Sequence, residues 1–144
     1  MNPLWQRGAR ALYATVLRAG SPLYLLRLWR RGAREPGYRQ ALAERFGVYH
    51  GAVPAPGLLW LHAVSLGETR AAVPLIEALR AQQPGLRLLL THGTATGRHA
   101  GLGLLQPGDQ QAWLPYDTPG AARRFLQRFQ PSVGVLMETE LWPD

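Results

Sequence analysis

From Gly57 onward, short apolar runs alternate with stretches of helical spacing. The first run, Leu58 to Val64, has the length of a buried strand, and Thr69 to Ala81 then spaces its apolar residues along one face of a helix. The apolar residues of that face are Val73, Leu75, Ile76 and Leu79. The first unit is therefore predicted to be a strand followed by a helix.

The same order continues along the chain, with strands predicted at Leu86 to Thr91, Gln111 to Leu114 and Ser132 to Met137, and helices after Gly97 and from Pro119 to Phe129. The last helix is predicted to turn four apolar residues inward, namely Ala122, Phe125, Leu126 and Phe129, and three arginines outward, namely Arg123, Arg124 and Arg128. Strands and helices that alternate in this way predict an α/β fold, a parallel sheet with helices on both faces.

The chain before Leu58 has a different pattern. Residues 32–57 are rich in glycine and proline and form a predicted connector with a short helical stretch from Tyr38 to Phe46, so the domain is predicted to cover residues 58–144. Residues 1–31 alternate short apolar runs with arginines, and no run reaches the ~18 apolar residues of a membrane span. The segment also lacks the apolar region and cleavage site of a secretory signal. An amphipathic helical leader is the remaining prediction.

The leader has the side chains of a membrane-surface segment. Its aromatic residues Trp5, Tyr13, Tyr24 and Trp29 suit the headgroup level, and its arginines Arg18, Arg27, Arg30 and Arg31 can reach lipid phosphates. The pattern favours membrane association. A helix docked on its own domain is one alternative, and a basic face that binds nucleic acid is another, less favoured one.

The net charge of +7 is uneven along the chain. Residues 1–50 contain nine Arg and two Glu, whereas the remainder balances seven Arg with seven acidic residues. Every basic residue is Arg, which suits bidentate phosphate or carboxylate contacts, although a GC-rich genome gives the same bias. There is no cysteine, so disulfides and thiolate metal sites are excluded.

Ligands of a parallel α/β sheet bind at the carboxyl edge, where strands end and helices begin. Four segments are predicted to lie there: Ser65 to Glu68, His92 to Gly97, Tyr116 to Asp117, and Glu138 to Asp144. All four are polar or contain glycine, and three carry a carboxylate. This edge is the predicted functional site.

Two of these segments allow both a functional and a structural interpretation. Glu68 follows a buried strand and is placed to act as a general base, but Ser65 with Glu68 three residues on is also a capping box. The hydroxyls and amides of His92 to Gly97 suit an anion, or form a plain turn. That loop has neither the Lys of a Walker A motif nor the spacing of a dinucleotide fingerprint.

The other two segments are read similarly. Asp117 is predicted to cap the helix that begins near Pro119. Glu138 and Glu140 point to the same side if the chain is extended there. His62 is predicted to be a core residue and His92 to end a strand. The histidines lack ligand spacing and no D-x-D pair exists, so neither a metal nor another cofactor is expected.

Four motifs carry a resemblance: HAVSLGE at 62–68, THGTATG at 91–97, LPYD at 114–117 and METELWP at 137–143. Together they resemble the N-terminal domain of the bacterial 3-deoxy-D-manno-octulosonic acid (Kdo) transferases of lipopolysaccharide synthesis. The resemblance extends back through the leader. It departs at His92 and Gly93, where that family usually has a further Thr or Met.

The resemblance implies a GT-B glycosyltransferase, with two Rossmann-like domains, that transfers Kdo from CMP-Kdo to lipid A precursor on the cytoplasmic side of the inner membrane. It implies that Glu68 is the general base and Glu138 the transition-state stabiliser. It further implies acceptor contacts from Ser65, Gly67, Thr94, Thr96, Gly97 and Glu140.

The chain ends at Asp144, before the donor-binding half of such an enzyme. CMP-Kdo is therefore expected to bind only with that half, and residues 1–144 alone are expected to be inert. No nucleic acid is expected as a partner. The alternative function is a non-catalytic, membrane-associated α/β adaptor in which the carboxylates serve as caps.

Overall fold

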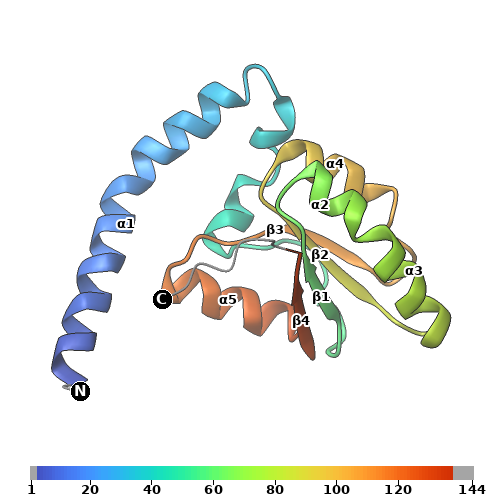
Figure 1. The fold of residues 1–144 in the computed structure, drawn as a ribbon. Helices are drawn as coiled ribbons and strands as arrows, with labels where there is room; N and C mark the ends of the chain where they lie inside the picture. Colours follow the sequence, from blue (N-terminus) through green and yellow to red (C-terminus); the bar gives the residue numbers. More distant parts are fainter. Residues whose placement is uncertain (1–2, 138–144) are drawn as a thin grey trace.

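The computed structural model describes residues 3–137, without the side chains of residues 3–7, 10, 14, 17 and 18. Its centre is a parallel sheet of four strands, β1 (Leu59–His62), β2 (Leu88–His92), β3 (Gln110–Trp113) and β4 (Val133–Leu136). The strands lie in the order β3-β2-β1-β4 (Figure 1). This is the strand order of a Rossmann-like half, so the predicted α/β class is confirmed.

Helices cover both faces of the sheet. α2 (Leu66–Ala71), α3 (Val73–Gln82) and α4 (Ala95–Leu102) lie over one face, and α5 (Pro119–Phe129) crosses the other on its way from β3 to β4 (Figure 1). Side chains alternate along each strand, so the core has two parts. Ile76 of α3 belongs to the part with Leu61 and Leu90, whereas Phe125 of α5 packs with Leu89.

The connector packs against the sheet near β3. It forms two 3₁₀ helices, η1 (Pro36–Arg39) and η2 (Leu42–Phe46), in place of one predicted helical stretch. The break falls at Ala41, whose φ of 48° is left-handed. Trp113, at the end of β3, donates from Nε1 to the Gln40 carbonyl at 2.8 Å and stacks on Tyr38. The connector thereby covers part of the α4 side of the sheet.

Two helix boundaries differ from the prediction. The single helix expected from Thr69 to Ala81 is split at Ala72 into α2 and α3, because Pro74 has no N–H to continue the first helix and is suited to the first turn of the second. α4 begins at Ala95, before Gly97, because Thr94 is already its N-cap and accepts from the Gly97 amide.

The inward face of α5 is also rotated from the predicted one. Phe125 and Phe129 are buried as expected, but Leu126 is 50% exposed, and Ala121 is buried whereas the predicted Ala122 is only half-buried. Leu126 adjoins Phe125 at about 100° around the helix, so only one of the two can point straight at the sheet. The larger ring takes that position against Trp60 and Tyr49.

α1 (Pro3–Arg31) is a 29-residue helix that stands along one side of the molecule (Figure 1). It runs without interruption through Pro22. Contacts with the rest of the chain concentrate toward its C-terminal end, where Leu28 is buried and the Trp29 carbonyl accepts from Arg39. Within residues 3–137, no helix combines the length and apolarity needed to cross a membrane.

Candidate functional site

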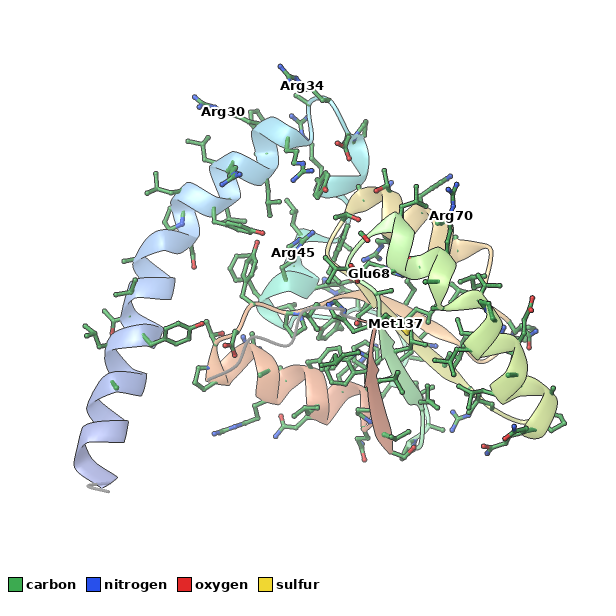
Figure 2. The ribbon with its side chains drawn as sticks, viewed as in Figure 1. Arg30, Arg34, Arg45, Glu68, Arg70 and Met137 are labelled. Atoms are coloured by element: carbon green, nitrogen blue, oxygen red, sulfur yellow. The ribbon has the colours of Figure 1, made fainter. Side chains whose placement is uncertain are left out.

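The site lies where the strand order reverses, between β1 and β4. In an open α/β sheet this reversal leaves a crevice beyond the carboxyl ends of the two strands. Glu68 follows β1 in the first turn of α2, and Met137 follows β4, with its amide bonded to the His62 carbonyl at 2.9 Å. Figure 2 shows Glu68 and Met137 toward the same end of the sheet. The turn that carries Glu68 and the end of β4 therefore lie at the same edge of the sheet.

The Glu68 carboxylate is held at both oxygens. The Val64 amide donates to Oε2 at 2.5 Å, and the Ser65 hydroxyl donates to Oε1 at 3.1 Å. In return the Glu68 amide donates to Ser65 Oγ at 3.3 Å. This confirms the capping box, with one variation: the carboxylate binds the amide of Val64, one residue before the N-cap Ser65.

Capping leaves the carboxylate chemically competent. Each carboxylate oxygen can accept about two hydrogen bonds, and each accepts one from the residues that the structure describes. Each oxygen can therefore accept from a further proton donor. Glu68 is half-buried, so solvent reaches the residue while two hydrogen bonds fix the orientation of its carboxylate. The cap and the general base, which the sequence presents as alternatives, are compatible in one side chain.

The hydroxyl loop after β2 is joined to the same turn through a single carbonyl. The Val64 oxygen accepts from the amides of Gly93 and Thr94, at 3.1 and 2.9 Å, and from the Thr94 hydroxyl at 3.0 Å. Gly97 lies directly against Ser65, since a Cβ at Gly97 would be 3.0 Å from the Ser65 carbonyl carbon. The fold therefore brings together Ser65, Glu68, Thr94 and Gly97, and these residues with Val64 are called the corner below.

Gly67 and Thr96 lie at the same corner but point outward. Both are exposed, and the Thr96 hydroxyl is 3.4 Å from that of Thr94. Thr96 borders an open cavity of about 650 Å³ between η1, α2 and α4, whose polar lining includes Arg70, His99 and Gln40. That the two exposed residues contact an acceptor stays a prediction.

The third predicted segment faces α1. Asp117 accepts from the Tyr13 hydroxyl at 3.3 Å, and the Tyr116 ring packs edge-on against Tyr24 at 5.1 Å. Burial raises the pKa of the Tyr116 phenol. The prediction that Asp117 caps α5 is wrong, because Thr118 is the N-cap and accepts from the Ala121 amide. Thr118, one residue later, has the extended backbone of an N-cap residue, so its hydroxyl reaches that amide.

The fourth segment, Glu138 to Asp144, lies outside the described residues. Glu138 and Glu140, the predicted transition-state stabiliser and its neighbour, both fall there. Their roles stay predictions.

A cluster of Arg45, Arg98, Glu44 and Trp113 beside β3 was not predicted from the sequence. Arg45 is 4% exposed and lies over the Trp113 ring at 4.1 Å, and burial lowers the pKa of its guanidinium. Glu44 accepts from Arg98 at 2.7 Å and from the Trp113 amide at 2.8 Å. No signal distinguished Arg45, because it is one of nine arginines in the first 50 residues.

No group of three or more His, Cys, Asp or Glu side chains that could hold a metal ion occurs among residues 3–137. The groups assembled at this edge of the sheet include the Glu68 carboxylate and the hydroxyls of Ser65 and Thr94. They can orient a hydroxyl-bearing ligand and take up a proton from it.

A Rossmann-like sheet with a fixed carboxylate at its switch point has the architecture of the N-terminal half of a GT-B glycosyltransferase. Residues 40–144 match the family model described as 3-deoxy-D-manno-octulosonic-acid transferase (kdotransferase), and the chain belongs to this family.

Individual relatives agree with the family. The chain is 50% identical over 143 residues to the 3-deoxy-D-manno-octulosonic acid transferase of Bordetella pertussis, with 94% of this chain and 33% of the relative covered. It is 37% identical to the Haemophilus influenzae protein of that name, with 94% and 32% covered. A probable mitochondrial transferase of Arabidopsis thaliana is 38% identical, with 92% and 30% covered. The chain thus spans about a third of the length of these relatives.

Proposed function

We propose that this chain forms the acceptor side of an enzyme that transfers Kdo from CMP-Kdo to lipid A precursor, with Glu68 as the general base. The observation that carries the proposal is the Glu68 carboxylate, held at both oxygens at the switch point of a domain of the Kdo transferase family. A base must meet its proton at hydrogen-bond distance, and a fixed carboxylate meets that demand without reorganisation.

In the proposed reaction an acceptor hydroxyl oxygen forms a bond to the anomeric carbon of Kdo while the bond from that carbon to the CMP phosphate breaks. The hydroxyl proton passes to Glu68, and CMP leaves with the electron pair. General-base assistance of this kind contributes about 10² to 10⁴ in rate. Glu138 is proposed to stabilise the positive charge that develops on the Kdo ring.

The hydroxyls of Ser65 and Thr94 donate their protons within the chain, which limits how they can bind the acceptor substrate. Ser65 donates its proton to Glu68, and Thr94 donates its proton to the Val64 carbonyl. Each hydroxyl oxygen retains acceptor capacity, so Ser65 and Thr94 are proposed to accept hydrogen bonds from acceptor hydroxyls. Gly67, Thr96, Gly97 and Glu140 complete the proposed acceptor contacts.

The leader is proposed to hold the chain on the cytoplasmic face of the inner membrane, where a lipid acceptor is found. α1 leaves a set of large apolar side chains exposed, namely Leu12, Tyr13, Val16, Leu23, Tyr24, Leu26 and Trp29. Arg30 and Arg34 project outward, away from the sheet (Figure 2). Exposed apolar and aromatic side chains beside outward arginines suit an anionic lipid surface.

The test joins residues 1–144 to the remaining sequence of the Bordetella pertussis relative and measures Kdo transfer to lipid A precursor. Glu68→Gln is expected to lower kcat by about 10² to 10⁴ while the melting temperature stays close to native, because Gln keeps much of the cap. Glu77→Gln on the exposed side of α3 is the matched control and should leave kcat unchanged.

Two outcomes oppose the proposal. Full activity of the Glu68→Gln chimera would remove the general base. A folded native chimera that binds lipid vesicles but transfers no Kdo would favour the non-catalytic adaptor.

A further inference from the structure

His92 is a buried polar residue directly beneath the turn that carries Glu68. It ends β2, is 0% exposed, and lies on the face of the sheet covered by α2 and α4. Its Nδ1 is 3.0 Å from the Ala63 carbonyl oxygen and 3.3 Å from the Thr69 hydroxyl. Its Nε2 is 3.2 Å from the side-chain nitrogen of Gln111. One imidazole therefore contacts the turn after β1, helix α2 and strand β3.

The surrounding groups define the tautomer of this imidazole. The Ala63 carbonyl can only accept, so Nδ1 must carry the proton. The Thr69 hydroxyl donates its own proton to the Ser65 carbonyl at 2.8 Å, so toward His92 it also acts as an acceptor. The Gln111 amide nitrogen can only donate, which requires an unprotonated Nε2. All these contacts are satisfied by one neutral form.

The Ala63–Val64 peptide connects His92 to Glu68. His92 Nδ1 donates to its carbonyl oxygen at 3.0 Å, and the amide at the other end of the same peptide donates to Glu68 Oε2 at 2.5 Å. A carbonyl that accepts a hydrogen bond polarises its peptide unit and makes the amide a stronger donor, by about 10 to 30% per bond. The two bonds therefore reinforce one another.

We propose that His92 is a positioning residue, which orients the Glu68 carboxylate through the Ala63–Val64 peptide and through Thr69. This inference rests on the proposed role of Glu68. His92 does not meet substrate itself, since the imidazole is enclosed between β2, α2 and α4.

Two further observations support the role. Gly101 of α4 leaves the space that the imidazole fills, since a Cβ there would be 2.5 Å from His92 Nε2. Burial lowers the pKa of His92 to about 4, so the neutral form that the contacts require is the form present at neutral pH. A protonated Nε2 would oppose the Gln111 amide with two donors face to face.

Two substitutions of similar polarity distinguish the contacts of His92 Nδ1 from those of His92 Nε2. His92→Asn places an amide nitrogen near the position of Nδ1 and keeps a donor for the Ala63 carbonyl. His92→Gln extends its amide toward Gln111 and withdraws that donor. The readout is the amide proton resonance of Val64 in the ¹⁵N-labelled 144-residue chain, because its shift reports the strength of the bond to Glu68.

The Val64 resonance is expected to move upfield in His92→Gln and to stay near its native position in His92→Asn. Glu68→Gln should also move it, which establishes that the resonance reports this bond. Phe125→Leu, which thins the core on the opposite face of the sheet, lowers stability without moving it. Equal Val64 shifts in the Asn and Gln variants would overturn the inference.

Kinetics of the chimera separate this inference from the proposed function. His92→Gln is expected to lower kcat about tenfold to a hundredfold with KM nearly unchanged, as expected for a misplaced catalytic group, and His92→Asn should restore most of it. If Glu68→Gln lowers kcat and His92→Gln leaves both kcat and the Val64 shift native, the positioning role alone is wrong. If Glu68→Gln has no effect on kcat, the proposed function itself fails.

Discussion

The corner that carries Glu68 and the leader helix α1 are held in opposite ways. At the corner, the Val64 residue alone takes part in four hydrogen bonds, to Glu68, Gly93 and twice to Thr94. In the first half of α1, Tyr13 donates to Asp117 at a longer 3.3 Å, and the large apolar side chains of Leu12, Tyr13 and Val16 are exposed.

The difference follows the demands proposed for the two regions. A general base needs a fixed direction, which buried and mutually satisfied hydrogen bonds provide. A membrane-surface helix needs exposed apolar area and outward arginines, which extensive docking on the domain would remove. The corner is therefore expected to respond to changes of a single atom, and α1 to changes of charge.

The largest effect is expected for binding of α1 to anionic vesicles. Replacing Arg27 and Arg30 of α1, together with Arg34 just after the helix, by Gln should weaken this binding by about 3 kcal/mol, or more than a hundredfold, because each Arg near an anionic surface contributes about 1 kcal/mol. Cosedimentation with phosphatidylglycerol vesicles measures it. Arg123→Gln on α5 is the control for Arg30→Gln alone, and equal effects of the two would contradict a surface centred on α1.

The pH dependence of stability should report the corner. Because burial lowers the pKa of His92 from 6.5 to about 4, the unfolded chain binds a proton between these values that the folded chain does not. The free energy of unfolding is therefore expected to fall by about 3 kcal/mol in all as the pH drops through this window, and to be insensitive to His92 above it. Urea unfolding of native and His92→Asn chains from pH 7 to 4 tests this, and identical pH slopes would refute it.

Replacement by alanine is expected to affect stability differently at two glycines near the end of α4. At Gly101 a Cβ would lie 2.5 Å from His92 Nε2, whereas at Gly103 it would lie 3.7 Å from the Ala100 carbonyl oxygen. Gly101→Ala is expected to destabilise the chain by about 2 kcal/mol through overpacking, and Gly103→Ala to be neutral within about 0.5 kcal/mol. Thermal unfolding compares them. Equal melting temperatures would mean that His92 can move.

The smallest effect is expected at the contact between α1 and Asp117. Tyr13→Phe removes one exposed hydroxyl and its bond to Asp117, which should cost less than about 0.5 kcal/mol. Chemical denaturation measures the change. A loss as large as that of Gly101→Ala would show that the first half of α1 is docked as firmly as the corner, and would remove the contrast between them.

The sequence predicted the regular part of the fold because its signals are local. The strands β1, β2 and β4 are short, mainly apolar runs, and α5 runs from Pro119 to Phe129 as predicted, with a proline in its first turn. Boundaries failed where two local signals competed. Asp117 and Thr118 are both good caps, and only the backbone geometry selected Thr118.

The candidate site was predicted in outline for the same reason. The carboxyl edge follows from the alternation of strands and helices, and Ser65 with Glu68 is visible as a capping box. The contacts of Arg45 and His92 could not be predicted, because their partners Trp113, Gln111 and Ala63 lie from 19 to 68 residues away along the chain.

The sequence by itself therefore determined the class of fold and the sheet edge at which the site is proposed, since both depend on patterns within one turn or one strand. The base role proposed for Glu68 came from the resemblance to a family, because the spacing alone also allows a cap. The tertiary structure alone decided that the Glu68 carboxylate accepts from Val64, that His92 is a neutral imidazole bonded to the same peptide, and that Leu126 faces solvent. These features depend on which side chain occupies a shared space, and that is settled only when distant segments pack together.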